Sequence, residues 1–407
     1  MQRPLSHVRV LDLSRVLAGP WASQNLADLG AEVLKIERPG SGDDTRSWGP
    51  PFLKDAAGKD TGEAAYFLSV NRGKKSVTLD ISTGDGQSIA RKLAAKCDVF
   101  IENYKVGGLA KYGLAYNDVR KINPSIVYCS ITGFGQSGPS AQRPGYDFIF
   151  QGMGGLMSIT GERDDQPGGG PQKVGIAVTD VLAGMYASLA ITAALAHRER
   201  TGTGQHIDLA LLDSIVAFGA NQILNYFTSG RIPARYGNAH ANVVPYEAFA
   251  TGDGHVILAV GNDSQFASFC KVADRPELAT DARYATMPER IRNRGELIPI
   301  LREVMKARPS RDWLEHLEAA NVPCGPINDY REVFEDPQVR HRRLKVEIPH
   351  PAGVVCPTVA SPMRLSETPV AYETPPPLLG QHTREVLGGL LGMRSEDLDR
   401  LAAMKVI

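Results

Sequence analysis

The chain contains few cysteines and lacks every common metal-binding spacing. Its five cysteines form no CxxC pair, which argues against a zinc ribbon or a thioredoxin-type redox motif. Its nine histidines form no HExxH or HxH pattern. The sequence therefore indicates no metal site. The cysteines are Cys97, Cys129, Cys270, Cys324 and Cys356.

An excess of charge of one sign and long apolar runs are missing as well. The 45 Lys and Arg residues equal the 45 Asp and Glu residues in number, whereas a nucleic-acid-binding protein carries a basic excess. No uncharged apolar run approaches the about 20 residues that span a bilayer. Asp12 and Arg15 interrupt the apolar part of the N-terminus, unlike a signal peptide. We expect no nucleic-acid partner, no membrane partner and a cytoplasmic location.

The N-terminal half alternates short apolar runs with helical patterns. A length of 407 residues suits two or three domains. Helical segments such as 84–95 separate the predicted strands, which favours an α/β fold with a Rossmann-type parallel sheet. The segment 183–197 is apolar on all faces, which predicts a buried helix. Strands are predicted at 8–13, 31–37, 75–80, 99–102 and 126–132.

The pattern changes around residue 230. Residues 249–260 hold Gly252-Asp253-Gly254 between two apolar runs, which predicts a β-hairpin. Short helical patterns follow to about residue 335, and a last helix is predicted at 383–391. These features indicate a second, smaller α+β domain.

Asp180 precedes the long apolar segment and has two interpretations. It is either an N-cap, or a carboxylate nucleophile that lies at a helix N-terminus. An unperturbed aspartate is ionised at neutral pH and needs no general base to attack a thioester. We expect the helix terminus to keep it ionised even where it is partly buried.

Three further segments allow both a functional and a plain interpretation. Residues 133–138 match GxGxxG after a predicted strand, but Pro139 and Pro144 leave no helix for a dinucleotide site, so a loop shaped to admit a ligand is favoured. The cations of residues 72–75 either hold phosphates or form a solvated turn. Gly261 follows an apolar strand and belongs either to an oxyanion-binding loop or to an ordinary turn.

Together these segments resemble the class III coenzyme A transferases, the family that includes formyl-CoA transferase. The resemblance covers almost the whole chain. Its motifs are RVLAGP (15–20), LGAEVLKIERPGSGDDTRSWGPPF (29–52), NRGKKSVTLD (71–80), GFGQSGP (133–139), RPGYDF (143–148), VTDVLAGMYA (178–187), VGNDSQF (260–266), VPCGPIND (322–329) and PPPLLGQHT (375–383).

The resemblance implies a fold and an assembly. A large Rossmann-type domain forms from residues 1–220 and 336–407, the C-terminal segment returning to it, and residues 221–335 form the small domain with its linkers. Two subunits interlock as a homodimer. No cofactor is tightly bound, since coenzyme A and acyl-CoA are substrates, together with small carboxylic acids.

The resemblance also implies site residues. Asp180 is the nucleophile that forms an aspartyl anhydride and then an aspartyl-CoA thioester. Gly261 stabilises the oxyanions in a loop that covers the site, and Tyr146 and Asp147 lie near the acyl group. Trp48 lines the acyl channel. Contacts with CoA fall on Leu17, Ala18, Arg38, Arg72, Lys74, Lys75, Leu79 and Lys111.

The motifs most resemble the branch that moves CoA from succinyl-CoA to C5 dicarboxylic acids such as glutarate. Formyl-CoA transferase has Gln at the position of Leu17, so oxalate and formyl specificity is not expected. A dicarboxylate needs a cation for its distal carboxylate, and Arg15 and Arg46 are the candidates, each with a structural role as the alternative.

Other activities remain as competing hypotheses. An α-methylacyl-CoA racemase uses a histidine where this chain has Tyr146, and tyrosine is a poor base at neutral pH. A nicotinamide-dependent oxidoreductase rests on the GxGxxG match alone. A non-catalytic CoA-binding protein is disfavoured because Asp180, Tyr146 and Gly261 are all present.

Overall fold

The computed structural model describes residues 3–407, which divide into two compact units. The large unit comprises the described residues up to 156, residues 174–223 and residues 340–407, and the small unit comprises residues 157–173 and 224–339. The sequence pattern predicts residues 157–173 to belong to the large domain. The structure groups them with the small unit because Arg235 donates hydrogen bonds to the carbonyl oxygens of Ser158 (3.1 Å) and Glu162 (3.3 Å).

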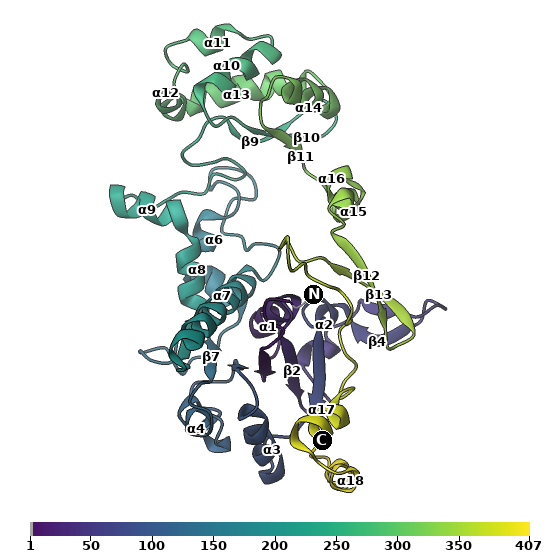
Figure 1. The fold of residues 1–407 in the computed structure, drawn as a ribbon. Coiled ribbons are helices and arrows are strands. Elements are labelled where there is room, and N and C mark those ends of the chain that lie inside the picture. Colours follow the sequence, from purple (N-terminus) through teal and green to yellow (C-terminus); the bar gives the residue numbers. More distant parts are fainter. Residues whose placement is uncertain (1–2) are drawn as a thin grey trace. The chain divides into compact units, whose positions relative to one another are not determined.

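A six-stranded parallel sheet organises the large unit (Figure 1). Its strand order is β5-β2-β1-β6-β7-β8, and every neighbouring pair is parallel. The strands are β1 (Arg9–Asp12), β2 (Glu32–Glu37), β5 (Lys74–Thr78), β6 (Val99–Glu102), β7 (Val127–Thr132) and β8 (His206–Ala210). The first five lie where the sequence predicted strands, whereas β8 was missed.

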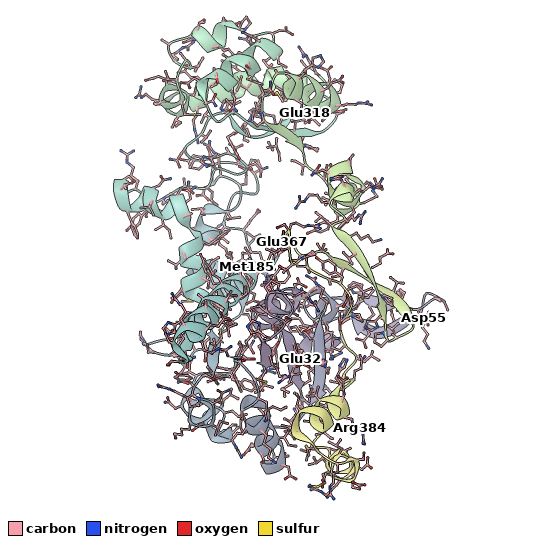
Figure 2. The ribbon with its side chains drawn as sticks, in the orientation of Figure 1. Glu32, Asp55, Met185, Glu318, Glu367 and Arg384 are labelled. Carbon is pink, nitrogen blue, oxygen red and sulfur yellow. The ribbon has the colours of Figure 1, made fainter. Side chains whose placement is uncertain are left out.

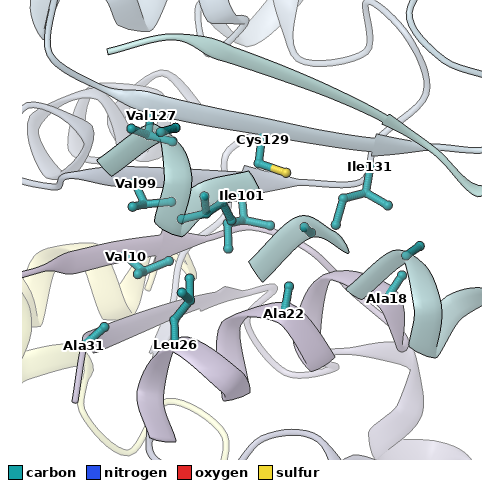
Figure 3. Packing of buried hydrophobic residues seen from close by; sticks show 14 of the residues in the cluster. Val10, Ala18, Ala22, Leu26, Ala31, Val99, Ile101, Val127, Cys129 and Ile131 are labelled. Carbon is teal, nitrogen blue, oxygen red and sulfur yellow. The ribbon is translucent and has the colours of Figure 1, made fainter. Parts of the chain in front are cut away.

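Helices cover both faces of this sheet because alternate strand residues point to opposite sides. On one face, strand residues such as Val10, Ile101 and Cys129 join an apolar cluster with α1 and α7 (Figure 3). On the other face, Leu11, Phe100 and neighbouring residues pack against the remaining helices. The first layer holds α1 (Ala18–Asp28), α5 (Asp147–Met153), α7 (Val178–Thr201) and α8 (Leu211–Phe218), and the second holds α3 (Gly84–Ala94), α4 (Tyr116–Ile122), α17 (Thr383–Leu391) and α18 (Ser395–Ala403).

The C-terminal segment packs onto the N-terminal sheet, as Figure 1 shows for α17. The Ser76 hydroxyl accepts from the Gly380 N–H (2.8 Å), and Thr383 Oγ1 accepts from the Thr78 N–H (2.9 Å). The helix predicted at 383–391 matches α17, but α18 was not predicted. Smaller elements of this unit are η1 (Asp44–Ser47), β3 (Phe52–Lys54), β4 (Asp60–Ala64), α2 (Ala65–Ser69), η2 (Ala110–Tyr112), β12 (Lys345–His350) and β13 (Val354–Val359).

Helix α7 differs from the fully buried helix that its sequence predicts. Within residues 3–407 it is the one helix long and apolar enough to cross a membrane. Its Ala183 and Ala187 are buried and pack against α1. Met185, labelled in Figure 2, is 49% exposed, and Leu189 is 66% exposed. The expectation of burial on all faces is therefore wrong for the single chain.

The small unit contains a three-stranded antiparallel sheet with strand order β11-β10-β9. The predicted hairpin is confirmed, because residues 251–254 connect β9 to β10. The unit holds β9 (Tyr246–Ala250), β10 (His255–Ala259), β11 (Cys324–Pro326), α10 (Asp263–Val272), α11 (Glu277–Thr280), α12 (Met287–Arg292), α13 (Arg294–Lys306), α14 (Ser310–Ala319) and α15 (Tyr330–Glu335). Helices α6 (Leu156–Ile159), α9 (Ala220–Ser229) and α16 (Pro337–His341) lie where the chain passes between the units.

Candidate active site

The strand order places a crevice at the carboxyl ends of β1 and β6. From β1 the chain first builds the sheet outward through β2 and β5, and then returns to the other side of β1 with β6. Loops that follow strands at such a switch point diverge and leave a ligand-binding crevice. A cavity of about 490 Å³ lies here. Its lining includes residues 15–18 after β1, residues 103–106 after β6, residues 131–133 at the end of β7, residues 141–146 in the loop that follows, and Asp180.

A second cavity of about 350 Å³ adjoins the first. It is lined by Arg38 and Leu79, and it shares Arg15, Tyr104 and Tyr112 with the first cavity. The shared residues make the two cavities neighbours along one surface of the large unit. The arrangement suits a long ligand with a reacting group at one end and anionic groups at the other.

Asp180 is not the N-cap of its helix. Helix α7 begins at Val178 and its N-cap is Ala177, so Asp180 is the third helical residue. Burial, with a further contribution from the negative charge of Asp147, raises the pKa of Asp180 to about 7. The sequence leads to the expectation that the helix terminus keeps this carboxyl ionised, whereas a pKa of about 7 leaves it only partly ionised at neutral pH.

Asp147 connects the starts of α5 and α7. Its Oδ1 accepts from the Thr179 N–H (2.7 Å), and its Oδ2 accepts from Gln151 Nε2 (2.7 Å). Gln151 Oε1 in turn accepts from the Val174 N–H (2.9 Å). These bonds place the carboxylate of Asp147 beside the residue that precedes Asp180. Tyr146 lines the cavity and is largely exposed.

Tyr66 lines neither cavity, but its hydroxyl is affected by the charges of the site. Burial raises the pKa of its hydroxyl, and the charges of Asp180 and Asp147 raise it further, so this hydroxyl lies within the field of both carboxylates. Its ring packs edge-on against Trp48, with centroids 5.1 Å apart. The cavity residues that the sequence did not indicate include Asn103, Tyr104, Lys105, Tyr112 and Arg143. The position after β6 at the switch point is the signal that could have indicated the residues of 103–112.

The loop after β1 is held in an unusual conformation by a buried ion pair. Val16 has a φ of 71°, a left-handed conformation that is costly for a β-branched residue. Its N–H faces both carboxylate oxygens of Asp43 at 3.3 Å, and Asp43 pairs with the fully buried Lys35 at 2.8 Å. Asn103 adds a clamp, since it accepts from the Arg15 N–H (2.9 Å) and donates to the Arg15 carbonyl (2.7 Å).

Comparison with known proteins identifies the family. Residues 5–383 match CoA-transferase family III. The chain belongs to this family. It is 51% identical over 387 residues to the succinate–glutarate CoA-transferase of Agrobacterium fabrum, covering 95% of this chain and 96% of that protein. It is 45% identical to the human succinyl-CoA:glutarate CoA-transferase, and the match covers 100% of this chain and 90% of that protein.

A solved structure supports the fold as well. A CAIB/BAIF family protein from Brucella suis has a TM-score of 0.84 and 46% identity, covering 96% of this chain and 100% of the solved chain. The family predicted from the sequence motifs is thereby confirmed, and the chain is an enzyme that transfers CoA. CoA thioesters are substrates of this family.

The cations of the basic cluster at residues 72–75 form ion pairs with acidic side chains of the large unit. Arg72 pairs with Asp28 (2.6 Å), and Lys75 pairs with Glu32, labelled in Figure 2, at 2.9 Å. Lys74 is fully buried, and burial lowers its pKa to about 7. Neither of the two cavities described above is lined by Arg72, Lys74 or Lys75. The cluster therefore contributes to the packing of the large unit, whereas the sequence left open whether it holds phosphates or forms a solvated turn.

Arg46 is also occupied by the protein itself. Its Nε and Nη2 donate to the two carboxylate oxygens of Glu37 at 2.7 Å each, and its guanidinium carbon lies 3.6 Å from the centroid of the Phe67 ring. It lines neither cavity. This geometry corresponds to the structural alternative for Arg46. Arg15, by contrast, lines both cavities and pairs with Asp44 (3.0 Å).

Gly261 belongs to the small unit, where its N–H is engaged. The N–H donates to Gln265 Oε1 (2.7 Å), while Asn262 caps α10 by accepting from the Gln265 N–H (2.9 Å). The next residue, Asp263, pairs with the fully buried Arg290 at 2.7 Å. For the Gly261 N–H to bind an oxyanion, the side chain of Gln265 has to release it.

The GxGxxG segment has no helix directly after it. It follows β7, and the next helix, α5, begins only at Asp147. Gly133 lines the first cavity. The interpretation as a loop open to a ligand therefore agrees with the structure. Within residues 3–407 no group of His, Cys, Asp and Glu side chains has a geometry that could hold a metal ion.

The Lys35–Asp43 pair leads to a stability prediction. Asp43→Ala leaves the Lys35 ammonium buried beside an empty position and removes the acceptor that faces the Val16 N–H. We expect a loss of about 3–5 kcal/mol in the free energy of unfolding, measured by urea denaturation. Asp44→Ala is the matched control, because its half-exposed pair with Arg15 contributes at most about 1 kcal/mol. Equal effects of the two substitutions would contradict this assignment.

Proposed function

We propose that this enzyme moves CoA from succinyl-CoA to a C5 dicarboxylic acid such as glutarate. The observation that carries the proposal is a cavity in which Asp180 lies among cationic side chains. An anionic acid substrate would be attracted to those cations and delivered to the carboxylate. The names of the relatives from Agrobacterium fabrum and Homo sapiens support the same pair of acids.

Asp180 is proposed as the nucleophile. Its carboxylate attacks the thioester carbonyl of succinyl-CoA and expels the CoA thiolate, which leaves a mixed anhydride of succinate and Asp180. The thiolate then attacks the aspartyl carbonyl, which gives an aspartyl-CoA thioester and free succinate. The acceptor acid reverses both steps. The energy of the thioester is conserved throughout, provided that water is excluded.

The two adjoining cavities support a path for CoA. We assign the adenine nucleotide end to the cavity of Arg38 and Leu79, and the thioester end to the cavity of Leu17, Ala18 and Asp180. Lys111 lies on the segment between them and is available to a phosphate. Trp48, which packs against Tyr66, is assigned to the acyl group. Coenzyme A is thus a substrate, with no tightly bound cofactor.

A homodimer is proposed as the active form, with the two chains interlocked. Large apolar side chains of the large unit are exposed, among them Phe148 on α5, Leu189 on α7 and Phe218 on α8. Burying such a surface against a second copy would be strongly favourable.

The free cysteines, four of them buried, are typical of a reducing compartment and support a cytoplasmic location.

Light scattering tests the dimer. We expect a mass of twice 44.0 kDa at micromolar concentration. Interlocked chains should not separate on dilution into the nanomolar range, because separation requires unfolding. A monomer at micromolar concentration would refute the dimer, and separation of folded chains on dilution would refute the interlocking.

The nucleophile is tested by Asp180→Ala and Asp180→Asn. Both should abolish transfer, since no carboxylate remains to form the anhydride, while CoA binding measured by calorimetry survives. Turnover is followed by mass spectrometry in deuterated water, with succinyl-CoA and a panel of free acids. A new acyl-CoA without deuterium supports transfer and identifies the acceptor. Deuterium without a new acyl-CoA would instead support the racemase alternative.

The raised pKa of Asp180 predicts an acid limb in the pH profile. The nucleophile must be ionised, so kcat/KM should fall about tenfold per pH unit below pH 7. Asp147→Asn removes the neighbouring negative charge, which lowers the pKa of Asp180 and moves the limb to lower pH. Asp118→Asn on α4 is the control and should leave the limb in place. If the acid limb of Asp147→Asn stays at the same pH or moves to higher pH, the charge of Asp147 does not raise the pKa of Asp180.

A further inference from the structure

The cations that line the cavity of Asp180 differ in what they already bind. Arg15 pairs with Asp44. Lys105 and Lys111 lie on the segment that also carries Tyr104 and Tyr112, which border the second cavity. Arg143 follows the neighbouring strand, on the loop between β7 and α5. It is therefore separate from the segment that leads toward Arg38.

Arg143 is held in place without a carboxylate partner. Throughout residues 3–407 no acidic group lies within ion-pairing distance of its guanidinium, whose Nη1 donates a long hydrogen bond to Ser140 Oγ (3.4 Å). Its guanidinium carbon lies 4.9 Å from the centroid of the Phe134 ring. Phe134 packs edge-on against the buried Phe150, with centroids 5.1 Å apart. Stacking restricts the guanidinium while leaving most of its N–H donors for a ligand.

The loop that carries Arg143 is anchored beside the proposed nucleophile. Four residues after Arg143, Asp147 accepts from the N–H of Thr179, the neighbour of Asp180. The carboxylate of Asp180 lines the cavity and that of Asp147 lies beside the preceding residue, so both repel a dianionic ligand, and a dicarboxylate needs a compensating cation. A planar guanidinium suits this task because it binds a carboxylate through two parallel hydrogen bonds.

We propose that Arg143 binds the distal carboxylate of the succinyl group of the donor and, afterwards, the distal carboxylate of the acceptor dicarboxylate. This inference rests on the proposed function. Succinate leaves before the acceptor enters, so one guanidinium serves both acids in turn. Lys105 and Lys111 then remain for the phosphates of CoA. Arg143 is thereby the residue that selects dicarboxylates over monocarboxylates.

Arg143→Gln tests this assignment with two matched substrate pairs. Glutarate is compared with valerate, and succinyl-CoA with butyryl-CoA, because each second member lacks only the distal carboxylate. We expect KM for glutarate and for succinyl-CoA to rise about 10- to 100-fold, whereas KM for valerate and butyryl-CoA stays unchanged. Arg143→Lys keeps the positive charge but lacks the planar guanidinium that donates two parallel hydrogen bonds, so it should recover part of the affinity. Arg120→Gln, an exposed arginine beside Tyr116 on α4, is the control.

The outcomes separate this inference from its alternatives. An equal loss with succinyl-CoA and butyryl-CoA would assign Arg143 to the phosphates of CoA and overturn the proposal, as would unchanged KM values for all four substrates. Where the wild type turns over monocarboxylates too slowly, inhibition constants of glutarate and valerate replace KM, with the same expected contrast. Failure of the wild type to transfer CoA from succinyl-CoA to any dicarboxylate would instead refute the proposed function.

Discussion

The architecture of the site depends on charges buried beneath the carboxyl ends of β1 and β2. The Lys35 ammonium, without contact to solvent, donates to Asp43 Oδ2 (2.8 Å) and to the Ser14 carbonyl (3.0 Å). Asp43 also accepts from the N–H and the hydroxyl of Thr45, which fixes the start of η1. Desolvating such a pair costs several kcal/mol per ion and is offset only where every lone pair is satisfied. Here the satisfied carboxylate also faces the Val16 N–H, and this arrangement lets the loop keep a positive φ at a β-branched residue.

The cations of the large unit divide into those that pair with acids of the fold and those that line the cavity of Asp180 without an acidic partner in the described part of the chain. Arg46, Arg72 and Lys75 each form ion pairs with acids of the large unit. Lys105, Lys111 and Arg143 line the cavity of Asp180, and none of them forms an ion pair within residues 3–407. Because an exposed, unpaired cation keeps its donors available, the second group supplies the anion-binding capacity of the site. The electrostatic character of the cavity thus follows from which arginines and lysines the fold has already neutralised.

Much of the fold could be predicted from the sequence, because buried parallel strands are marked by short apolar runs between helical patterns. Strand β8 was missed because it is less buried than the central strands and carries His206 and Asp208. The burial of α7 was overestimated because its composition does not distinguish a helix that packs on all sides from one with an exposed apolar face. For the site, the motifs indicated Asp180 and Tyr146, which line one cavity, and Asp147, which accepts from the N–H of the residue before Asp180. The acidity of Asp180 could not be predicted, since burial and the approach of Asp147 arise only in the folded chain.

The basic cluster at 72–75 explains why local patterns fail for single cations. Three cations in four residues are consistent with phosphate binding, yet their partners Asp28, Glu32 and Glu385 come from distant parts of the chain. No local spacing reveals those partners, because they lie on α1, β2 and α17 and meet the cluster only in the folded chain. Arg143 presents the opposite case, since its own loop offers Phe134 for stacking and no acid to pair with. The role of a cation in this enzyme is therefore decided by whether the fold supplies its counter-charge, and a cation left without one at a cavity wall is where substrate recognition is to be sought.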